Sequence, residues 1–515
     1  MLYDSTPPYE HHSHLTFARE PLKSLYVFQR LFTTILLVPC WWIYYLILPR
    51  SHRPRPSWSL KQIIFVNFTR RISKVTEVAG MTWSTRNPEE EAKDGDLHET
   101  RFEWIEPLPE ELRCGIVVSE GDRVPFKRVG AFIWPKEAPC LMGGLATPAP
   151  QIHQFDFEAT STVPRDIEAS AADASIIGIF MHGGGYTHMS AHEKARTSRI
   201  PRTLLKEKLC SQVYSVEYRL LQFAPFPAVV QDAAAVYAHV VKTFPRSKTV
   251  LIGDSSGGNL VLALARWIRD EGKLRMPDGL LLLSPSCDTS HAIPETYSSH
   301  IPRPNASTDY LTDTVEPRAI LQATFLGFKY YPPDHHLLSH TDLTKRQKVV
   351  EESRQLREVV HSEYVSAASP RVLQCWGHEV AQHQLVMDVE SSDGESSSMA
   401  KSLSHSLSPP SGPISQSSAS QASLASVIQT PYRQACKFSA LFAHFPRTLV
   451  VIGDAERLVN EVRSLVKAME KDCVDVKCHW AKDAPHDLLI IPEGWWDEGV
   501  REEAWVAVGE WMKGF

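Results

Sequence analysis

The sequence lacks the excess of basic residues that a nucleic-acid-binding protein needs. Its formal net charge at pH 7 is -6 over 515 residues, whereas a nucleic-acid partner requires a basic face. Its 9 cysteines lack the close spacing of metal ligands, and because their number is odd they cannot all pair. They leave the redox compartment undecided. We therefore expect no nucleic-acid partner, no bound metal and no cofactor.

One apolar run near the N-terminus approaches the thickness of a bilayer. Residues 31–48 contain no charged side chain and lie between Arg30 and Arg50. Spanning a membrane takes about 20 apolar residues, and the aromatic residues near the C-terminal end of the run suit a membrane interface. We predict an N-terminal tail at 1–30 and a membrane anchor at 31–48. A buried core helix remains an alternative, as does, because of Pro39, a kinked helix lying in one leaflet.

The basic residues around this run do not fix its orientation. They precede it at Arg19, Lys23 and Arg30 and follow it at Arg50, Arg53, Arg55 and Lys61. Positive residues prefer the cytosolic side, so the slightly larger number after the run favours, by a small margin, a cytosolic location for the rest of the chain.

Beyond the anchor, short apolar runs alternate with helical stretches, which is typical of α/β proteins. Continuous apolar runs suit strands that are buried on both faces of a mostly parallel sheet. The runs lie at 129–134, 176–181, 213–217, 249–252, 280–283 and 448–452, and the helical stretches include 229–243 and 259–273. We predict an α/β domain over 126–515, preceded by a cap region at 61–125 that begins with a helix at 61–79.

Two segments interrupt the alternation. Residues 138–175 are rich in Pro, Ala and Gly, which predicts a long loop insertion. Residues 391–428 are dominated by serine. Such a segment buries too little apolar surface to offset the chain entropy lost on folding, so we predict a disordered insertion there.

A glycine-flanked serine follows one of the predicted strands. Residues 253–257 read Gly-Asp-Ser-Ser-Gly and lead into a helix near Asn259, the strand–turn–helix context of a G-x-S-x-G nucleophile. The sharp turn leaves no room for side chains at Gly253 and Gly257. We predict Ser255 as a nucleophile at a helix N-terminus, where the dipole favours developing negative charge.

A glycine-rich loop follows an earlier predicted strand. His182 leads into Gly183, Gly184 and Gly185, and no Lys-Ser/Thr pair follows, which disfavours a phosphate-binding loop. A tetrahedral intermediate needs preorganised N–H donors for its oxyanion. We predict that the N–H groups of Gly184, Gly185 and Ser256 form an oxyanion hole, in a loop that His182 and Gly183 help to shape.

A nucleophilic serine also needs a base, and the base needs an orienting carboxylate. His486 follows a strand-like stretch at 476–480 and is the predicted base. The carboxylate should follow the strand at 448–452, where both Asp454 and Glu456 are eligible. The order serine, acid, histidine is the one found in α/β hydrolases.

Taken together, the motifs resemble the hormone-sensitive-lipase-like (fold-3) branch of the α/β-hydrolase family from residue 126 to the C-terminus, apart from the insertions. The resemblance is carried by His-Gly-Gly-Gly-Tyr at 182–186, Tyr-Arg-Leu at 218–220, Phe-Pro-Ala at 226–228 with Asp232, and Gly-Asp-Ser-Ser-Gly-Gly at 253–258. It implies the α/β-hydrolase fold, with a mostly parallel central sheet flanked by helices and with a cap or lid.

The resemblance also bears on the acid. Members of this family commonly have a leucine two residues after the acid and a carboxylate five residues after it. Leu458 and Glu461 fit this pattern when Glu456 is the acid. Glutamate departs from the commoner aspartate, which keeps Asp454 as the alternative.

Two further departures concern substrate binding. Leu221-Gln222-Phe223 replaces the usual Ala-Pro-Glu, and the region 309–369 enlarges the interval between nucleophile and acid and is a candidate part of a lid. More loosely, the anchor together with this domain resembles membrane-bound fungal steryl acetyl hydrolases. That resemblance implies removal of acetyl groups from sterol esters at the endoplasmic reticulum, with the catalytic domain in the lumen.

The function predicted from the sequence is a serine carboxylic-ester hydrolase in lipid metabolism, with no cofactor. It would cleave short- to medium-acyl or sterol and lipid esters through an acyl-enzyme intermediate. A ligand-binding protein without catalysis on the same scaffold is one alternative. An amidase or peptidase with the same triad is another.

Overall fold

The structure is a computed structural model that describes residues 17, 19–80, 85–119, 123–137, 175–294, 300–332, 335–339, 341–379 and 438–515. The serine-rich insertion predicted at 391–428 lies outside the described residues. The loop insertion predicted at 138–175 also lies outside them, except for its last residue, as do residues 1–16 of the predicted tail.

The described residues contain an eight-stranded, mostly parallel sheet with the order β1-β2-β4-β3-β5-β6-β7-β8. β1 and β4 each pair antiparallel with β2, and the other neighbours pair in parallel. The strands are β1 (Arg101–Ile105), β2 (Val129–Trp134), β3 (Ile176–Met181), β4 (Gln212–Glu217), β5 (Lys248–Asp254), β6 (Gly279–Leu283), β7 (Arg447–Gly453) and β8 (Val476–Ala481).

The apolar runs of the sequence are the inner strands of this sheet. Each of the six predicted runs is a strand whose ends differ by at most two residues from the prediction. Side chains alternate between the two faces of a strand, and Leu251 and Ile252 accordingly belong to the cores on opposite faces. The region 61–125, predicted as a cap, also contributes β1 to the sheet edge. The alternation of charged and aromatic side chains in β1 suits a half-buried edge strand.

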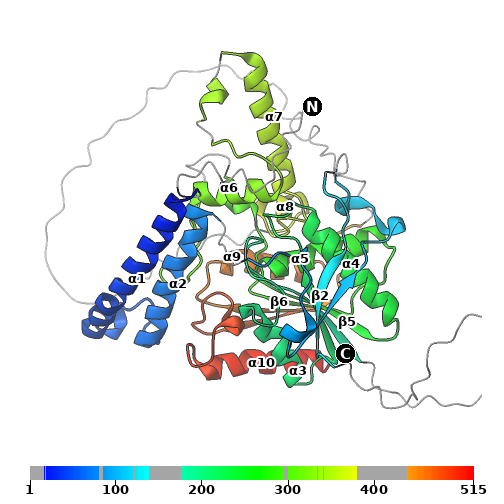
Figure 1. Cartoon of the computed structure of the whole chain (residues 1–515), viewed down its shortest axis with the longest axis horizontal. Helices are drawn as coiled ribbons and strands as arrows, with labels where there is room; N and C mark the ends of the chain where they lie inside the picture. The colour runs from blue at the N-terminus through cyan, green and yellow to red at the C-terminus, as the bar shows by residue number, and fades with distance from the viewer. Residues whose placement is uncertain are drawn as a thin grey trace, which may run out of the picture. The chain divides into compact units, whose positions relative to one another are not determined.

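Helices cover both faces of the sheet (Figure 1). α4 (Ala228–Thr243), α5 (Ser256–Glu271) and α9 (Val459–Lys471) contribute to the larger core, whereas α3 (Arg199–Lys206) and α10 (Glu498–Met512) contribute to the core on the other face. α5 begins three residues before the predicted helix at 259–273 and ends at Gly272, whose φ of 63° forms a left-handed C-cap.

Within the described residues, the long interval between β6 and β7 contains three α-helices, of which α7 lies at the top of Figure 1. They are α6 (Val315–Phe325), α7 (Leu343–Val360) and α8 (Pro370–Cys375). Ala319, Phe325 and Leu356 belong to the larger core, so this region is a folded part of the domain and packs on the same face of the sheet as α4, α5 and α9.

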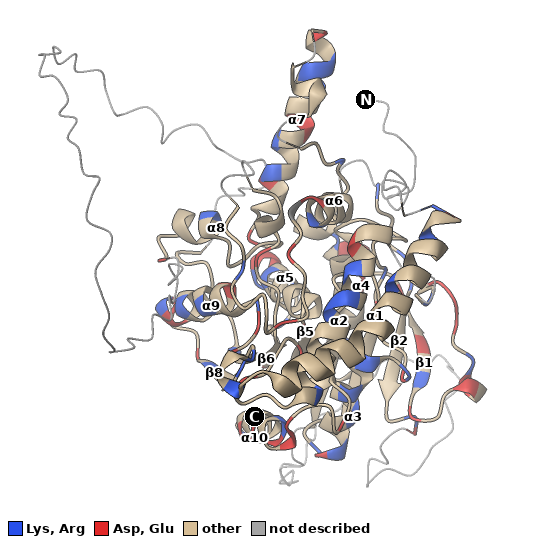
Figure 2. Cartoon of the chain, turned by 90° about the vertical axis from the view of Figure 1, so that its left-hand side faces the viewer, with Lys and Arg blue, Asp and Glu red and all other residues tan. Residues whose placement is uncertain are grey.

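Two N-terminal helices lie side by side (Figure 2). α1 (Leu22–Ile47) contains the predicted anchor and begins earlier than residue 31. Among the described helices, α1 alone is long and apolar enough to cross a membrane, and 6% of its most apolar window is buried. α2 (Leu60–Ala79) starts at a capping box formed by Ser59 and Gln62.

Candidate active site

The predicted nucleophile lies in a sharp turn between β5 and α5. Ser255 has φ 53° and ψ -119°, a strained conformation for a residue with a side chain. A Cβ on Gly253 would lie 2.3 Å from the carbonyl oxygen of Gly257, and one on Gly257 would lie 2.0 Å from that of Met181. The two glycines therefore make the turn possible, and the turn presents Ser255 at the N-terminus of α5.

His486, in the loop after β8, lies between Ser255 and Glu456. Its Nε2 is 2.9 Å from Ser255 Oγ, and its Nδ1 is 3.0 Å from Glu456 Oε2. Glu456 comes from the loop after β7. The side chains of His486 and Glu456 are 2% and 0% exposed, so bulk water does not compete for this bond. The structure brings the three predicted residues into one hydrogen-bonded chain, the arrangement that a serine triad requires.

The two eligible carboxylates differ in where they point. Glu456 Oε1 accepts hydrogen bonds from Ser284 Oγ at 2.6 Å and from the N–H of Gly453 at 2.7 Å, which leaves Oε2 for His486. Asp454 instead accepts the N–H of Asp483 at 2.8 Å, and its side chain is 35% exposed. The geometry therefore favours Glu456 over Asp454 as the partner of His486.

The pKa of Glu456 reflects its position. Burial raises this pKa to about 7, while the hydrogen bond and the positive charge of His486 oppose the shift. The hydrogen bonds that Glu456 accepts from His486 and Ser284 favour its charged form against the effect of burial.

The glycine-rich loop lies directly beside the nucleophile. The N–H of Gly185 donates to Ser256 Oγ at 2.9 Å, and the Tyr186 hydroxyl donates to the carbonyl of Ser256 at 2.8 Å. Gly184 has φ 111°, and a Cβ there would lie 2.3 Å from the carbonyl oxygen of His188. The glycine-rich loop is thus held against Ser256, the residue that follows Ser255, and the oxyanion hole of Gly184, Gly185 and Ser256 stays a prediction.

The first two residues of the loop have other partners. The N–H of Gly183 donates to Asp254 Oδ1 at 2.9 Å. His182 is buried and stacks on Tyr218 with 4.3 Å between ring centroids. Burial lowers the pKa of His182 to about 4, so its imidazole is neutral near pH 7. These contacts fit the shaping role that the sequence predicted for His182 and Gly183.

Comparison with known proteins places this geometry in a family. Residues 178–349 match the family model described as the alpha/beta hydrolase fold. An acetyl-hydrolase of Streptomyces hygroscopicus is 30% identical over 169 residues, which are 32% of this chain and 52% of that protein. An esterase of Acinetobacter venetianus is 30% identical over 172 residues, 33% of this chain and 50% of that protein. The chain therefore spans about half the length of these two relatives.

Hormone-sensitive lipase of Mus musculus is 30% identical over 130 residues, 24% of this chain and 16% of that protein. The matched region and this relative support the resemblance to the hormone-sensitive-lipase-like branch of the α/β hydrolases. A solved esterase of the bacterial hormone-sensitive lipase family covers 89% of this chain and 99% of its own, at 16% identity and a TM-score of 0.43.

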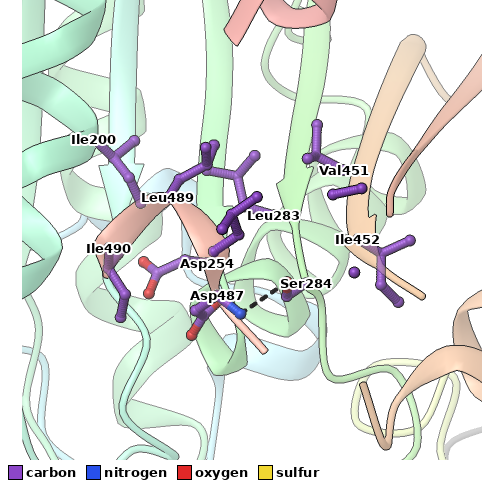
Figure 3. Close-up of a pocket in the computed structure, with 12 residues that line it drawn as sticks. Ile200, Asp254, Leu283, Ser284, Val451, Ile452, Asp487, Leu489 and Ile490 are labelled. Carbon is purple, nitrogen blue, oxygen red and sulfur yellow. Dashed lines mark hydrogen bonds between the residues drawn. The ribbon is translucent and has the colours of Figure 1, made fainter. Parts of the chain in front are cut away.

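A second carboxylate contacts the base of this hydrolase domain. Asp487 Oδ2 lies 3.1 Å from His486 Nε2, and the side chain of Asp487 is 6% exposed. Asp487 and the buried Asp254 line the same pocket (Figure 3). Burial, and then the charge of Asp487, raise the pKa of Asp254 well above its usual value.

Asp487 and Glu456 both affect the protonation of His486, the predicted base. Burial by itself would lower the pKa of His486, but the charge and hydrogen bond of Asp487, followed by those of Glu456, raise it well above its usual value. A general base must be neutral to accept a proton. In the hydrolase domain, His486 is consequently charged over a wider pH range than an ordinary histidine.

Sequence reasoning missed three supporting residues of the site. Ser284 holds Glu456 and also accepts the N–H of Asp487 at 3.1 Å. Asp309, which is 0% exposed, accepts the N–H of His486 at 3.3 Å and that of Arg457 at 2.7 Å. Asp487 carried a signal in the sequence, because it directly follows the predicted base. Ser284 and Asp309 carried none, since they reach the site from distant segments.

Replacing the two carboxylates one at a time tests the choice of acid. We expect Glu456→Gln to lower the rate at which a fluorophosphonate labels Ser255 by on the order of 10³-fold or more, because His486 loses the partner that orients it. Asp454→Asn is the matched control and should stay within about twofold of the wild type. A larger loss in Asp454→Asn than in Glu456→Gln would contradict this assignment.

Removing the charge of Asp487 should move the pH dependence of labelling. Asp487 raises the pKa of His486, so Asp487→Asn should lower that pKa. The acidic limb, which is the part of the pH profile where protonation of His486 slows labelling, should therefore shift to lower pH. Asparagine tolerates the left-handed backbone at this position, where φ is 51°. Asp483→Asn, in the same loop, should leave the limb in place. An unchanged limb in Asp487→Asn would exclude this role for Asp487.

Proposed function

We propose that the protein is a serine carboxylic-ester hydrolase. The observation that carries this proposal is the hydrogen-bonded chain from Ser255 through His486 to Glu456, beside a glycine-rich loop that offers backbone N–H donors. The related acetyl-hydrolase and esterase support the same class of reaction. The chemistry requires no cofactor.

The proposed reaction follows from the contacts. His486 Nε2 accepts the proton of Ser255 as Oγ attacks the ester carbonyl, and Glu456 stabilises the imidazolium through Nδ1. The N–H groups of Gly184, Gly185 and Ser256 stabilise the oxyanion. His486 then protonates the leaving alcohol, and water hydrolyses the acyl-enzyme by the same steps with His486 again as the base.

We assign the substrate to short- to medium-acyl or sterol and lipid esters. Two relatives support small acyl groups by their names, the acetyl-hydrolase and a versiconal hemiacetal acetate esterase of Aspergillus parasiticus that is 25% identical over 161 residues. The apolar N-terminal helix favours an alcohol that partitions into lipid. In this proposal residues 126–515 are the catalytic domain, and residues 61–125 contribute to the entrance of its active site.

The proposed anchor is physically joined to the active site. Most large apolar side chains of α1 are exposed, including Phe28 at 67% and Ile47 at 77%, and exposed apolar surface of this extent favours a membrane partner. Thr34 of α1 accepts a hydrogen bond from Arg71 of α2 at 3.0 Å. Arg70 of α2 donates to the carbonyl of Asp309 at 2.7 Å, and Asp309 supports His486.

This connection is consistent with a membrane-borne substrate. The resemblance to steryl acetyl hydrolases supports the endoplasmic reticulum as the membrane, and the side on which the catalytic domain lies follows from the orientation of α1. Two alternatives to an esterase are an amidase or peptidase with the same triad and a binding protein without catalysis. Enzyme assays distinguish these alternatives from ester hydrolysis.

Loss of the nucleophile should abolish ester hydrolysis. We expect Ser255→Ala to lower kcat on p-nitrophenyl acetate by at least about 10³-fold, because the acyl-enzyme cannot form. Stopped assays on sterol acetates, acylglycerols and peptide amides then define the substrate class. Equal rates for Ser255→Ala and the wild type would refute the proposal, and faster cleavage of amides than of esters would favour a peptidase.

Charges on the exposed face of α1 should release the protein from membranes. We expect the triple variant Phe32→Lys, Ile35→Lys and Leu36→Lys to become soluble on alkaline extraction, since each lysine costs about 3 kcal/mol at the bilayer centre. The three wild-type side chains are 52%, 55% and 54% exposed. Hydrolysis of p-nitrophenyl acetate in detergent should change by less than about twofold.

The matched control places lysine at exposed apolar residues outside α1. Leu343, Val350 and Val506 are 67%, 50% and 53% exposed, and their triple replacement should leave the protein in the membrane pellet. Retention of the α1 variant in the pellet would contradict the anchor.

A further inference from the structure

Three potential metal ligands meet away from the active site. His291, His300 and Asp313 each offer one ligand atom, and these atoms all lie within 4.8 Å of one another. All three residues belong to the segment between β6 and α6. The cluster plays no part in the proposed ester hydrolysis.

The hydrogen bond of His291 fixes the direction of its lone pair. Its Nε2 is 2.9 Å from the carbonyl oxygen of Ile301, and because a carbonyl only accepts, Nε2 carries the proton. In the neutral imidazole Nδ1 is then a bare lone pair. This Nδ1 lies 3.5 Å from Asp313 Oδ1, so two acceptors face each other without a hydrogen between them. A cation placed between them would convert this repulsion into two bonds.

The carboxylate of Asp313 is oriented in the same way. Its Oδ2 accepts the N–H of Arg303 at 3.0 Å, which turns Oδ1 toward His291. The side chains of His291 and Asp313 are 16% and 5% exposed. An ion could therefore reach the cluster from solvent at His291 and would then be largely shielded from water.

His300 completes the cluster. Its ring is tilted by 65° to that of His291, with 4.9 Å between centroids. Among the residues that the structure describes, Nδ1 of His291 and Nδ1 of His300 are both buried without a hydrogen-bond partner. Buried polar atoms normally have a partner, so these two nitrogens in one cluster need an explanation.

We propose that His291, His300 and Asp313 form a zinc-binding site. Two imidazoles and one carboxylate are a ligand set that Zn²⁺ uses in proteins, and water would fill the remaining coordination. Metal-ligating histidines typically donate their other N–H to a backbone carbonyl, and ligating carboxylates are themselves hydrogen-bonded. His291 and Asp313 have these supporting bonds already.

Neighbouring charges permit a cation at this position. The guanidinium of Arg303 is 2.7 Å from the carboxylate of Glu461, and that of Arg457 is 3.6 Å from Asp313 Oδ2. These carboxylates reduce the repulsion between the two guanidiniums and a metal ion. The charge of Arg318 also acts on His291 and Asp313, and the carboxylate of Asp313 would offset it at the ion.

The position of the site gives the ion a structural role. The segment between its ligands carries Asn305, which donates to the carbonyl of Glu456 at 2.8 Å, and Asp309, which accepts the N–H of His486. An ion that joins His291 to His300 and Asp313 closes this segment into a loop. It would thereby hold the loop against the residues that support the triad.

Metal titration of the purified full-length chain tests the site. After treatment with a chelator and its removal, the protein is titrated with Zn²⁺ in competition with a chromophoric indicator, and with Co²⁺ as a visible spectroscopic probe. We expect one saturable zinc per chain and the absorption bands of a nitrogen- and oxygen-ligated cobalt ion. Zinc should also raise Tm.

Two variants and a control make the assignment specific. His300→Ala and Asp313→Asn should weaken zinc binding by more than about 100-fold, since each removes a direct ligand and loss of a supporting bond alone costs 10- to 100-fold. The control variant is His479→Ala, which replaces a half-buried histidine on β8. It should bind zinc as tightly as the wild type does. His300→Ala without metal should match the Tm of the metal-free wild type, which separates loss of the ligand from loss of the fold.

The titration has two outcomes that would overturn the proposal. One is a wild-type chain without saturable zinc binding. The other is equal binding by the wild type and His300→Ala. Neither outcome depends on esterase activity, so the zinc site and the proposed function fail independently.

Discussion

The register between β3 and β5 is the constraint on which the active site depends. Met181 pairs with Gly253, so the two strands end together, and the glycine-rich loop and the nucleophile turn leave the sheet side by side. The backbones approach so closely that a Cβ on Gly257 would lie 2.0 Å from the carbonyl oxygen of Met181. Bare backbone at this crossing lets N–H donors and a serine hydroxyl share one small volume, which preorganises the site before substrate arrives.

The other half of the site depends on bonds between segments that are distant in the sequence. Ser284 at the end of β6 binds both the acid loop and the histidine loop, and Asp309 binds His486 across 177 residues. Glu456 is thus oriented by a residue at the end of β6, and the His486 side chain is held by Glu456 from the end of β7. Such cross-bonding suits a triad, because small errors in position are costly to catalysis.

Much of the fold could be predicted because its strands are continuous apolar runs buried on both faces. The fold class is confirmed by the sheet and by the matched family. β1 was missed because Arg101 and Glu103 interrupt its pattern at the sheet edge. Ser255 and His486 followed from local motifs and chain order. Their catalytic roles stay predictions, although the structure joins them by a hydrogen bond.

The remaining features of the site could not be read from local sequence. Glu456 rather than Asp454 turns inward, where Ser284 and the N–H of Gly453 both donate to its carboxylate. Likewise, with 22 histidines in the chain, no spacing singles out His291 and His300. Their relation to Asp313 arises only when the segment folds back on itself.

The packing of α2 has a consequence for how this protein could evolve. Ile63 and Val66 of α2 share an apolar cluster with Ala484 and Leu488, which lie on either side of His486 in the sequence. The N-terminal helical pair is therefore part of the same cooperative folding unit as the histidine loop. Recombination that exchanged this pair for an unrelated leader would expose that cluster, so the helices and the hydrolase domain are expected to be inherited together.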